Sequence, residues 1–199
     1  MSRQYCTRCQ RPLVTCICNL CCHIENNVRV IFLQHPSEEK QAKGTAMLAH
    51  LSLQNSNIII GENFDESVEL NSLINDVNNH VLLLYPTEDT QVVSKLSTDM
   101  QKQTIILVLD GTWKKAYRMY QLSTNLQQLN KITLANNIKS QYVIRKHHKD
   151  SDVSSLEACA HALIALEGNN DKYAELLDSF TKFNQFQLSL ANKNRNERN

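Results

Sequence analysis

The stretch "TIILVLDGTW", residues 104–113, decides the fold expected for this chain. Its first six residues form a nearly continuous apolar run, which is typical of a strand buried on both faces of a parallel sheet. The run ends at Asp110, and Gly111 allows a turn before Trp113, the only tryptophan of the chain. Ligands of an open parallel sheet bind beyond the carboxyl ends of its strands. The stretch therefore predicts a buried strand that places a carboxylate at such a site.

Similar apolar runs predict the rest of the sheet. They occupy residues 28–33, 57–60 and 80–85, with a weaker run at 132–134. Helical patterns lie at residues 38–53, after Trp113, after Ser154, and from residue 171 to about 190. This order favours an α/β fold in which helices cover both faces of a mostly parallel sheet.

Composition and length set the class of protein. A chain of 199 residues, 42% hydrophobic and 21% charged, fits one α/β domain with a small appendage and argues against wholesale disorder. The first ten residues lack the apolar core of a secretory signal, and no apolar run is long enough to span a bilayer. We therefore expect a cytoplasmic protein that has no membrane partner.

The net charge of +1 indicates no general affinity for polyanions, but the charges are distributed unevenly along the chain. Residues 61–100 carry eight acidic side chains and a single lysine, whereas residues 101–160 carry nine Lys or Arg and four acids. One side of the molecule could thus be basic and face a nucleic acid. Charges scattered over two solvated faces explain the same pattern equally well.

Six of the seven cysteines lie between residues 6 and 22, which indicates a metal site because a cytosolic protein does not normally keep disulfides. Four thiolates fill a closed tetrahedral site, so structural zinc is the expected occupant. The predicted ligands are the pairs Cys6 and Cys9, and Cys16 and Cys18. An iron–sulfur centre or a redox dithiol is the alternative, and Cys21 or Cys22 could replace a ligand of the second pair.

Polar residues follow three of the predicted strands and open one predicted helix, at residues 34–38, 86–88, 110–113 and 154–158. Each group also has a purely structural interpretation. Ser154 and Glu157 have the spacing of a capping box, and Thr112 could cap the helix that follows it. Trp113 is harder to explain in this way, because on the crevice side it offers a flat surface for a base or adenine.

Taken together, these motifs resemble the DTW-domain family, the tRNA-uridine aminocarboxypropyltransferases. In chain order they are Cys6-x-Arg8-Cys9-x-x-Pro12-x-x-x-Cys16-x-Cys18, Gln34-His35-Pro36-x-Glu38, Gly44-Thr45, Leu84-Tyr85-Pro86, Asp110-Gly111-Thr112-Trp113-x-x-Ala116, Ser140-x-Tyr142-x-x-Arg145-Lys146 and Ser154-Ser155-Leu156-Glu157-Ala158. The sequence departs from the family at Gly44, where many members have Asn, and at Ser155, where many have Thr. The second change retains a hydroxyl.

The resemblance implies a SPOUT-like fold, knotted near a pocket for S-adenosylmethionine. It also implies transfer of the 3-amino-3-carboxypropyl group of that donor to N3 of a uridine in tRNA, with release of methylthioadenosine. We accordingly expect a zinc module at residues 1–24, a DTW catalytic domain at 25–190 and a disordered tail at 191–199.

The resemblance also suggests roles for the motif residues. The catalytic set is Asp110, as general base, with Thr112 and Trp113. The donor-binding set is Leu84, Pro86, Gly111, Ser154, Ser155 and Glu157. The substrate-binding set is His35 and Glu38, which would orient the uridine, with Arg145 and Lys146. The last two would contact RNA phosphates, together with His147, His148, Arg8 and Arg11.

Two other functions remain open at this stage. One is an S-adenosylmethionine-dependent RNA methyltransferase of the SPOUT type, and the other is a zinc-containing RNA-binding protein without catalysis. Neither the modified uridine, nor the tRNAs concerned, nor the oligomeric state follows from the sequence.

Overall fold

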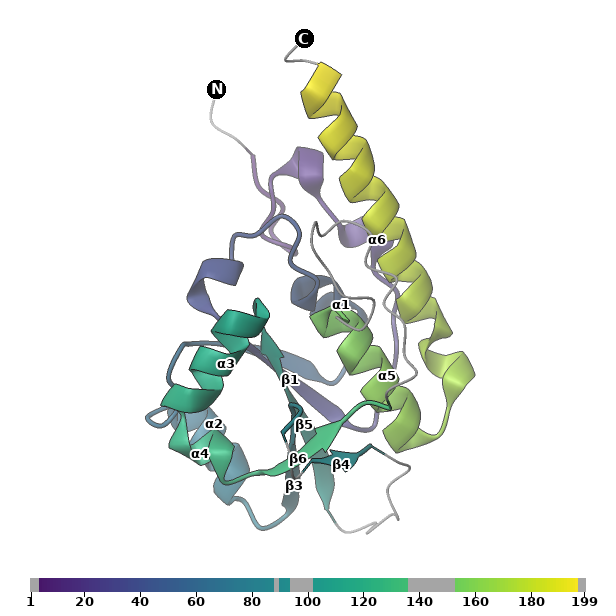
Figure 1. Ribbon diagram of the computed structural model, residues 1–199. Coiled ribbons are helices and arrows are strands. Elements are labelled where there is room, and N and C mark those ends of the chain that lie inside the picture. The colour runs from purple at the N-terminus through teal and green to yellow at the C-terminus, as the bar shows by residue number, and fades with distance from the viewer. Residues whose placement is uncertain (1–3, 88–89, 94–101, 136–152, 197–199) are drawn as a thin grey trace.

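A six-stranded sheet with all strands parallel forms the centre of the computed structural model, which describes residues 4–87, 90–93, 102–135 and 153–196 (Figure 1). The strands are β1 (Arg29–Gln34), β2 (Ser56–Ile60), β3 (Asn79–Leu84), β4 (Gln91–Val92), β5 (Gln103–Asp110) and β6 (Asn130–Thr133). Their order across the sheet is β2-β1-β5-β3-β6-β4. The predicted strand from the opening stretch, β5, is therefore an inner strand that pairs with β1 and β3.

Helices cover both faces of the sheet, as predicted. Figure 1 shows α1 (Ala46–Ser52), α5 (Ser155–Glu167) and α6 (Asn170–Asn196) on one side, and α2 (Val68–Asn75), α3 (Trp113–Leu122) and α4 (Thr124–Gln127) on the other. Successive side chains of β5 alternate between the two cores: Ile106 and Val108 join the first, and Ile105 and Leu107 the second. Because both faces are buried, the strand needs apolar residues throughout, which explains its continuous run.

The cysteine-rich segment packs against the core formed with α1, α5 and α6. It contains two short 3₁₀ helices, η1 (Leu13–Thr15) and η2 (Cys18–Leu20). Ile17, between them, is fully buried in the same cluster as Phe180 and Phe183 of α6. The guanidinium of Arg11 lies 5.5 Å from the centre of the Phe183 ring. The segment thus shares a hydrophobic core with the rest of the chain, and the boundary at residue 24 stays a prediction.

The helix predicted at residues 38–53 is wrong in its first half. A 3₁₀ helix, η3 (Pro36–Glu38), and turns precede α1, which begins only at Ala46. Arg11 explains the difference, because its guanidinium donates to the carbonyls of Ala42 and Gly44 at 2.6 and 2.9 Å. Those two carbonyls are therefore engaged with a distant side chain where a helix would use them for its own backbone hydrogen bonds.

Two further predictions concern the chain beyond the sheet. Helix α6 continues to Asn196, past the end expected near residue 190, so residues 191–196 of the tail predicted to be disordered are helical. The knot expected from the resemblance stays a prediction, since residues 136–152, which lead into α5, lie outside the described residues. Among the residues that the structure describes, no helix combines the length and the apolar character needed to cross a membrane.

Phe183 is the residue with which we test the packing of α6 against the cysteine-rich segment. Its side chain is fully buried, so Phe183→Ala should lower the free energy of unfolding by about 3–5 kcal/mol through lost burial and a cavity. Urea unfolding measures this change. Leu188→Ala on the same helix, where the side chain is half exposed, serves as the control and should cost less than about 1 kcal/mol. Equal losses in both variants would contradict the packing described.

Candidate active site

Two buried polar side chains meet at the carboxyl ends of β1 and β5. Gln34 and Asp110 are register partners across the two strands, with exposed fractions of 4% and 5%. Gln34 Nε2 donates a hydrogen bond of 2.7 Å to Asp110 Oδ2. The strand register thus holds the carboxylate of Asp110 at the edge of the sheet where the sequence predicted it.

The second oxygen of Asp110 binds the first residue of α5. Ser155 Oγ donates to Asp110 Oδ1 at 2.6 Å. Three segments far apart in the sequence, at Gln34, Asp110 and Ser155, are therefore joined through one carboxylate. The sequence motifs named all three residues but did not reveal that they are partners.

The start of α5 is fixed by the capping box that the sequence allows. Ser154 Oγ accepts from the amide of Glu157 at 3.2 Å, and Glu157 Oε2 accepts from the amide of Ser154 at 2.8 Å. Thr45 adds a third bond, since its Oγ1 accepts from the amide of Leu156 at 3.4 Å. The carboxylate of Glu157 thus turns back to its own helix terminus. Its predicted role in binding the donor stays a prediction.

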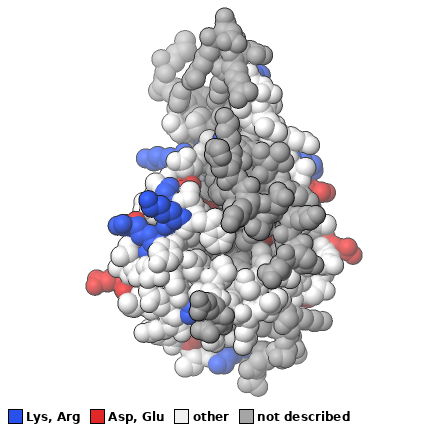
Figure 2. Space-filling view, in the orientation of Figure 1, with Lys and Arg blue, Asp and Glu red and all other residues white. Residues whose placement is uncertain are grey.

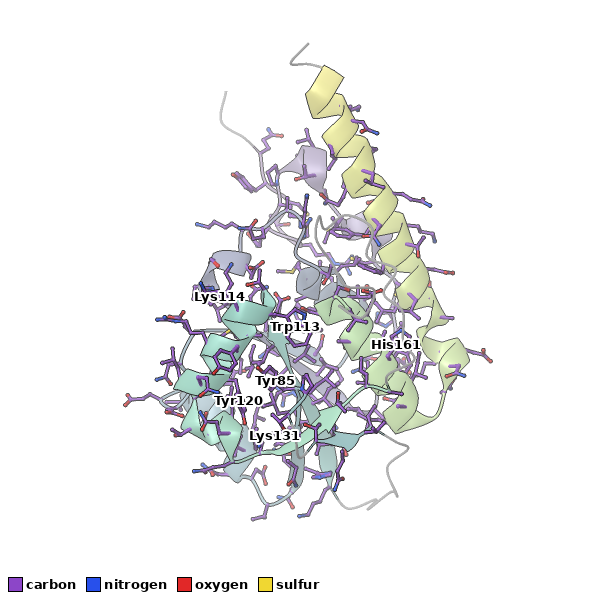
Figure 3. All side chains as sticks on the ribbon, in the orientation of Figure 1. Tyr85, Trp113, Lys114, Tyr120, Lys131 and His161 are labelled. Atoms are coloured by element: carbon purple, nitrogen blue, oxygen red, sulfur yellow. The ribbon has the colours of Figure 1, made fainter. Side chains whose placement is uncertain are left out.

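A pocket lies beside this helix terminus and contains about 550 Å³ of space, part of it open to solvent. Its described lining is Leu84, Tyr85, Pro86, Val108, Leu109, Gly111, Trp113, Ala116, Val153, Ser154, Ser155 and Ala158. Five of the six residues predicted to bind the donor are among these, the exception being Glu157. An apolar lining with a few polar groups is typical of a small-molecule site. Trp113 at the start of α3 and Tyr85 after the end of β3, both labelled in Figure 3, line this pocket.

Asp110 and Thr112 are absent from this described lining. Ser155, which binds Asp110, does reach the pocket, so the carboxylate stands one hydrogen bond behind the wall. Thr112 caps α3, because its Oγ1 accepts from the amide of Lys115 at 3.4 Å. The structural interpretation of Thr112 is thus confirmed, and its catalytic role stays a prediction.

His35 and Glu38, predicted to orient the substrate, make contacts that tie the end of β1 to α3. His35 Nδ1 accepts from the amide of Ser37 at 3.2 Å, so a neutral ring carries its proton on Nε2, which lies 3.2 Å from Glu62 Oε1. Arg118 Nε donates to the same oxygen at 2.7 Å. These bonds from His35 and Arg118 lower the pKa of the Glu62 carboxyl.

A second ion pair strengthens the same connection. Lys115 Nζ lies 2.7 Å from Glu38 Oε1, and both side chains are largely buried. Two charged contacts thus fix the first turns of α3 beside the end of β1. Neither His35 nor Glu38 is among the described residues lining the pocket, so their role in substrate binding stays a prediction.

The four cysteines predicted as metal ligands form one group that could hold a metal ion. Their sulfur atoms all lie within 4.8 Å of one another. The Cys6–Cys18 and Cys9–Cys16 sulfur separations are 3.6 and 3.7 Å, close to the ~3.8 Å edge of a tetrahedron with metal–sulfur bonds of ~2.3 Å. Cys21 is not in the group, and its thiol donates to the carbonyl of Ile17.

Two pKa values describe how the cluster would bind a cation. Backbone amides of Cys9 and Arg8 point at the Cys6 sulfur and lower the pKa of its thiol to about 6. Burial and the neighbouring thiols raise the pKa of Cys18. The Cys6 thiolate therefore forms readily near neutral pH, whereas Cys18 favours its protonated form. A divalent cation would stabilise the thiolate form of its ligands, so the donor set suits a metal ion.

The basic residues predicted to contact RNA differ in their exposure to solvent. Arg11 is only 9% exposed, and its hydrogen bonds to Ala42 and Gly44 leave it buried inside the protein. A role in binding phosphates is therefore wrong for this residue. Arg8 is on the surface and donates to the carbonyl of Leu51. Arg145 and Lys146, with His147 and His148, lie outside the described residues.

Comparison with known proteins gives one family and several relatives. A family described as "DTW domain" matches residues 3–188. A Drosophila melanogaster protein named tRNA-uridine aminocarboxypropyltransferase 2 is 29% identical over 193 residues, which cover 94% of this chain and 76% of that protein. Proteins of the same name from Macaca fascicularis and Mus musculus are each 31% identical, and the match covers 94% of this chain and 64% of theirs. No solved structure matches the chain significantly.

The cysteine group leads to a prediction about metal content. Cys6→Ser should remove one of the four sulfurs, reduce the metal bound from about one ion per chain to almost none, and lower the thermal midpoint. Metal analysis by mass spectrometry, together with thermal unfolding, measures both effects. Cys21→Ser is the matched control and should keep the metal. A Cys6→Ser protein with full metal content, or a Cys21→Ser protein without metal, would contradict the assignment.

Proposed function

Because the chain belongs to the DTW-domain family, we propose that it is a tRNA-uridine aminocarboxypropyltransferase. It would transfer the 3-amino-3-carboxypropyl group of S-adenosylmethionine to N3 of a uridine in tRNA and release methylthioadenosine. The observation that carries the proposal is the pocket at the carboxyl edge of the sheet, where family motifs from three separate segments come together. Its relatives bear the name of this activity.

The pocket offers suitable surroundings for the donor. Leu84, Pro86 and Val108 supply apolar walls for the adenosine part, and Trp113 a flat aromatic surface. The amino terminus of α5, at Ser155, has the positive end of the helix dipole, which favours the carboxylate of the transferred arm. This arrangement would place the arm at the helix terminus and the sulfonium between it and the apolar walls.

The reaction needs one displacement and no covalent enzyme intermediate. The bond from uridine N3 to the terminal carbon of the arm forms as the bond from that carbon to sulfur breaks. The electron pair of the broken bond stays on sulfur, which becomes the neutral thioether of methylthioadenosine. The protein's main task is to bring the correct carbon, and not the methyl group, next to N3.

The proton on N3 must leave as the new bond forms, and Asp110 is our candidate for its final acceptor. Ser155 stands between Asp110 and the pocket, so we propose that its Oγ accepts the N3 proton as its own proton passes to Asp110 Oδ1. Ser155 replaces the Thr of many family members, and the hydroxyl that this route needs is retained. General-base assistance of this kind contributes about 10²- to 10⁴-fold to a rate.

We assign zinc to the cysteine group, where four thiolates would leave no open coordination position for chemistry. The metal would then hold the cysteine-rich segment and take no part in the transfer. The described structure has no disulfide among the seven cysteines, and we propose a cytoplasmic location, where thiols are kept reduced. Arg145 and Lys146 remain our candidates for contacts to tRNA phosphates.

The proposed activity predicts two products in equal amounts. Purified protein, S-adenosylmethionine and unmodified tRNA should give aminocarboxypropyl-uridine in the RNA and methylthioadenosine in solution. Mass spectrometry of digested RNA and of the supernatant measures both. Methylated uridine with S-adenosylhomocysteine would instead support a methyltransferase. Binding of tRNA without any modification, over a range of tRNAs, would support a non-catalytic RNA-binding protein.

The proton route predicts a ranked set of variants. Asp110→Asn and Ser155→Ala should each lower kcat by about 10²- to 10⁴-fold, and the double variant should fall no further, because both residues serve one step. Ser155→Thr is the matched control and should keep most of the activity. Thermal midpoints show whether the variants fold. Full activity of Asp110→Asn would remove Asp110 from the mechanism, whereas full activity of Ser155→Ala alone would remove only the relay.

A further inference from the structure

The outward face of α3 carries two exposed aromatic side chains that the fold does not require. Trp113 and Tyr117 are 48% and 58% exposed. They lie four residues apart, so both are on the same side of the helix, about 6 Å apart along its axis. Ala116 and Met119 are the buried residues of α3 and pack it on the sheet. Neither exposed ring is among these buried residues.

The charged residues of the same helix are all cationic. The sequence of α3, "WKKAYRMYQL", contains three Lys or Arg and no acid. Lys114 is exposed and has no ion pair among the described residues. Arg118 is exposed and donates to Glu62 through Nε, and within the described part of the chain its terminal nitrogens make no further hydrogen bond. Figure 2 shows Lys and Arg side chains gathered on the side of the molecule where α3 begins.

This face is continuous with the pocket. Trp113 lines the pocket and also starts the exposed face. Tyr85, another lining residue, stacks on Tyr120 of α3 with ring centres 4.7 Å apart (Figure 3). Burial, together with the hydroxyls of Tyr120 and Tyr117, raises the pKa of Tyr85. A ligand could thus extend from the pocket onto α3 without a break.

We propose that Trp113, Lys114, Tyr117 and Arg118, the α3 stacking face, bind unpaired nucleotides next to the target uridine. The inference rests on the proposed function and names the part of the substrate that the site would hold. N3 of a uridine is engaged when the base is paired, so the target must be unpaired and its neighbours in a loop are accessible too. Aromatic rings stack on any base, and cations meet the phosphates.

Trp113 makes the face directly observable, because it is the only tryptophan of the chain. The fluorescence of Trp113 should be quenched on titration with unmodified tRNA, and also with a single-stranded oligonucleotide copied from the tRNA loop that contains the target uridine. A duplex of the same length should quench it much less. This readout does not depend on catalysis. Unchanged fluorescence at saturating tRNA, with binding shown independently, would overturn the proposal.

Variants of Tyr117 separate stacking from folding. Tyr117→Ala should raise the Kd for tRNA by about 5- to 100-fold, the effect of losing one stacked base. Tyr117→Phe keeps the ring and should bind like the wild type. Affinity for S-adenosylmethionine and the thermal midpoint should stay unchanged in both, because Tyr117 is exposed. Val77→Ala, at an exposed apolar residue outside the face, is the control for general surface effects.

Lys114 provides a second, independent variant. Lys114→Ala should weaken binding to all RNAs and reduce the slope of log Kd against log salt concentration by about one. Wild-type affinity in both Tyr117→Ala and Lys114→Ala would overturn the proposal even if the protein modifies tRNA. The opposite outcome is also distinguishable. If the wild-type protein makes no aminocarboxypropyl-uridine but the two variants bind RNA more weakly than it does, the proposed function is refuted and the α3 stacking face is supported.

Discussion

The carboxylate of Asp110 is the constraint on which the site depends. A charged group that is 5% exposed is costly unless strong hydrogen bonds replace its water, and Gln34 and Ser155 supply two of them. Hydrogen bonds to charged groups contribute about 1.5–3 kcal/mol each. Satisfying this one carboxylate therefore favours a structure in which the end of β1, the end of β5 and the start of α5 meet. The pocket beside Ser155 follows from that meeting.

A second chain of contacts connects the cysteine group to the same place. Arg11, two residues after Cys9, holds the carbonyls of Ala42 and Gly44. The next residue, Thr45, accepts from the amide of Leu156, beside Ser155. A metal ion that orders the cysteine-rich segment would thus also order the helix terminus that binds Asp110. This gives the proposed zinc a structural bearing on the active site although it lies outside the pocket.

The sequence predicted the sheet well because β1, β3 and β5 are buried on both faces and must be apolar along their length. It failed where tertiary contacts decide local structure. Residues 39–45 are not helical, since Arg11 takes carbonyls that a helix would need, and this residue is 31 positions from Ala42. Helix α2 went unpredicted because only Leu70 of its residues is buried, which leaves a weak apolar pattern. Gln34 gained its role from a partner 76 residues away, which no local pattern reveals.

The stretch around Asp110 has a buried part, the end of β5, and an exposed part, the outward face of α3. The strand end keeps the carboxylate inside, where it reaches the pocket only through Ser155, while the helix that follows carries its aromatic and cationic side chains outward. The two parts must keep a fixed distance if an RNA base held on α3 is to meet the donor. The Glu38–Lys115 pair and the contacts of Glu62 with His35 and Arg118 join α3 to the end of β1 and to the segment after β2. The motif that follows β1 thus positions the helix that would present RNA, which gives His35 and Glu38 a structural reason to belong to the family pattern beside their predicted role in substrate binding.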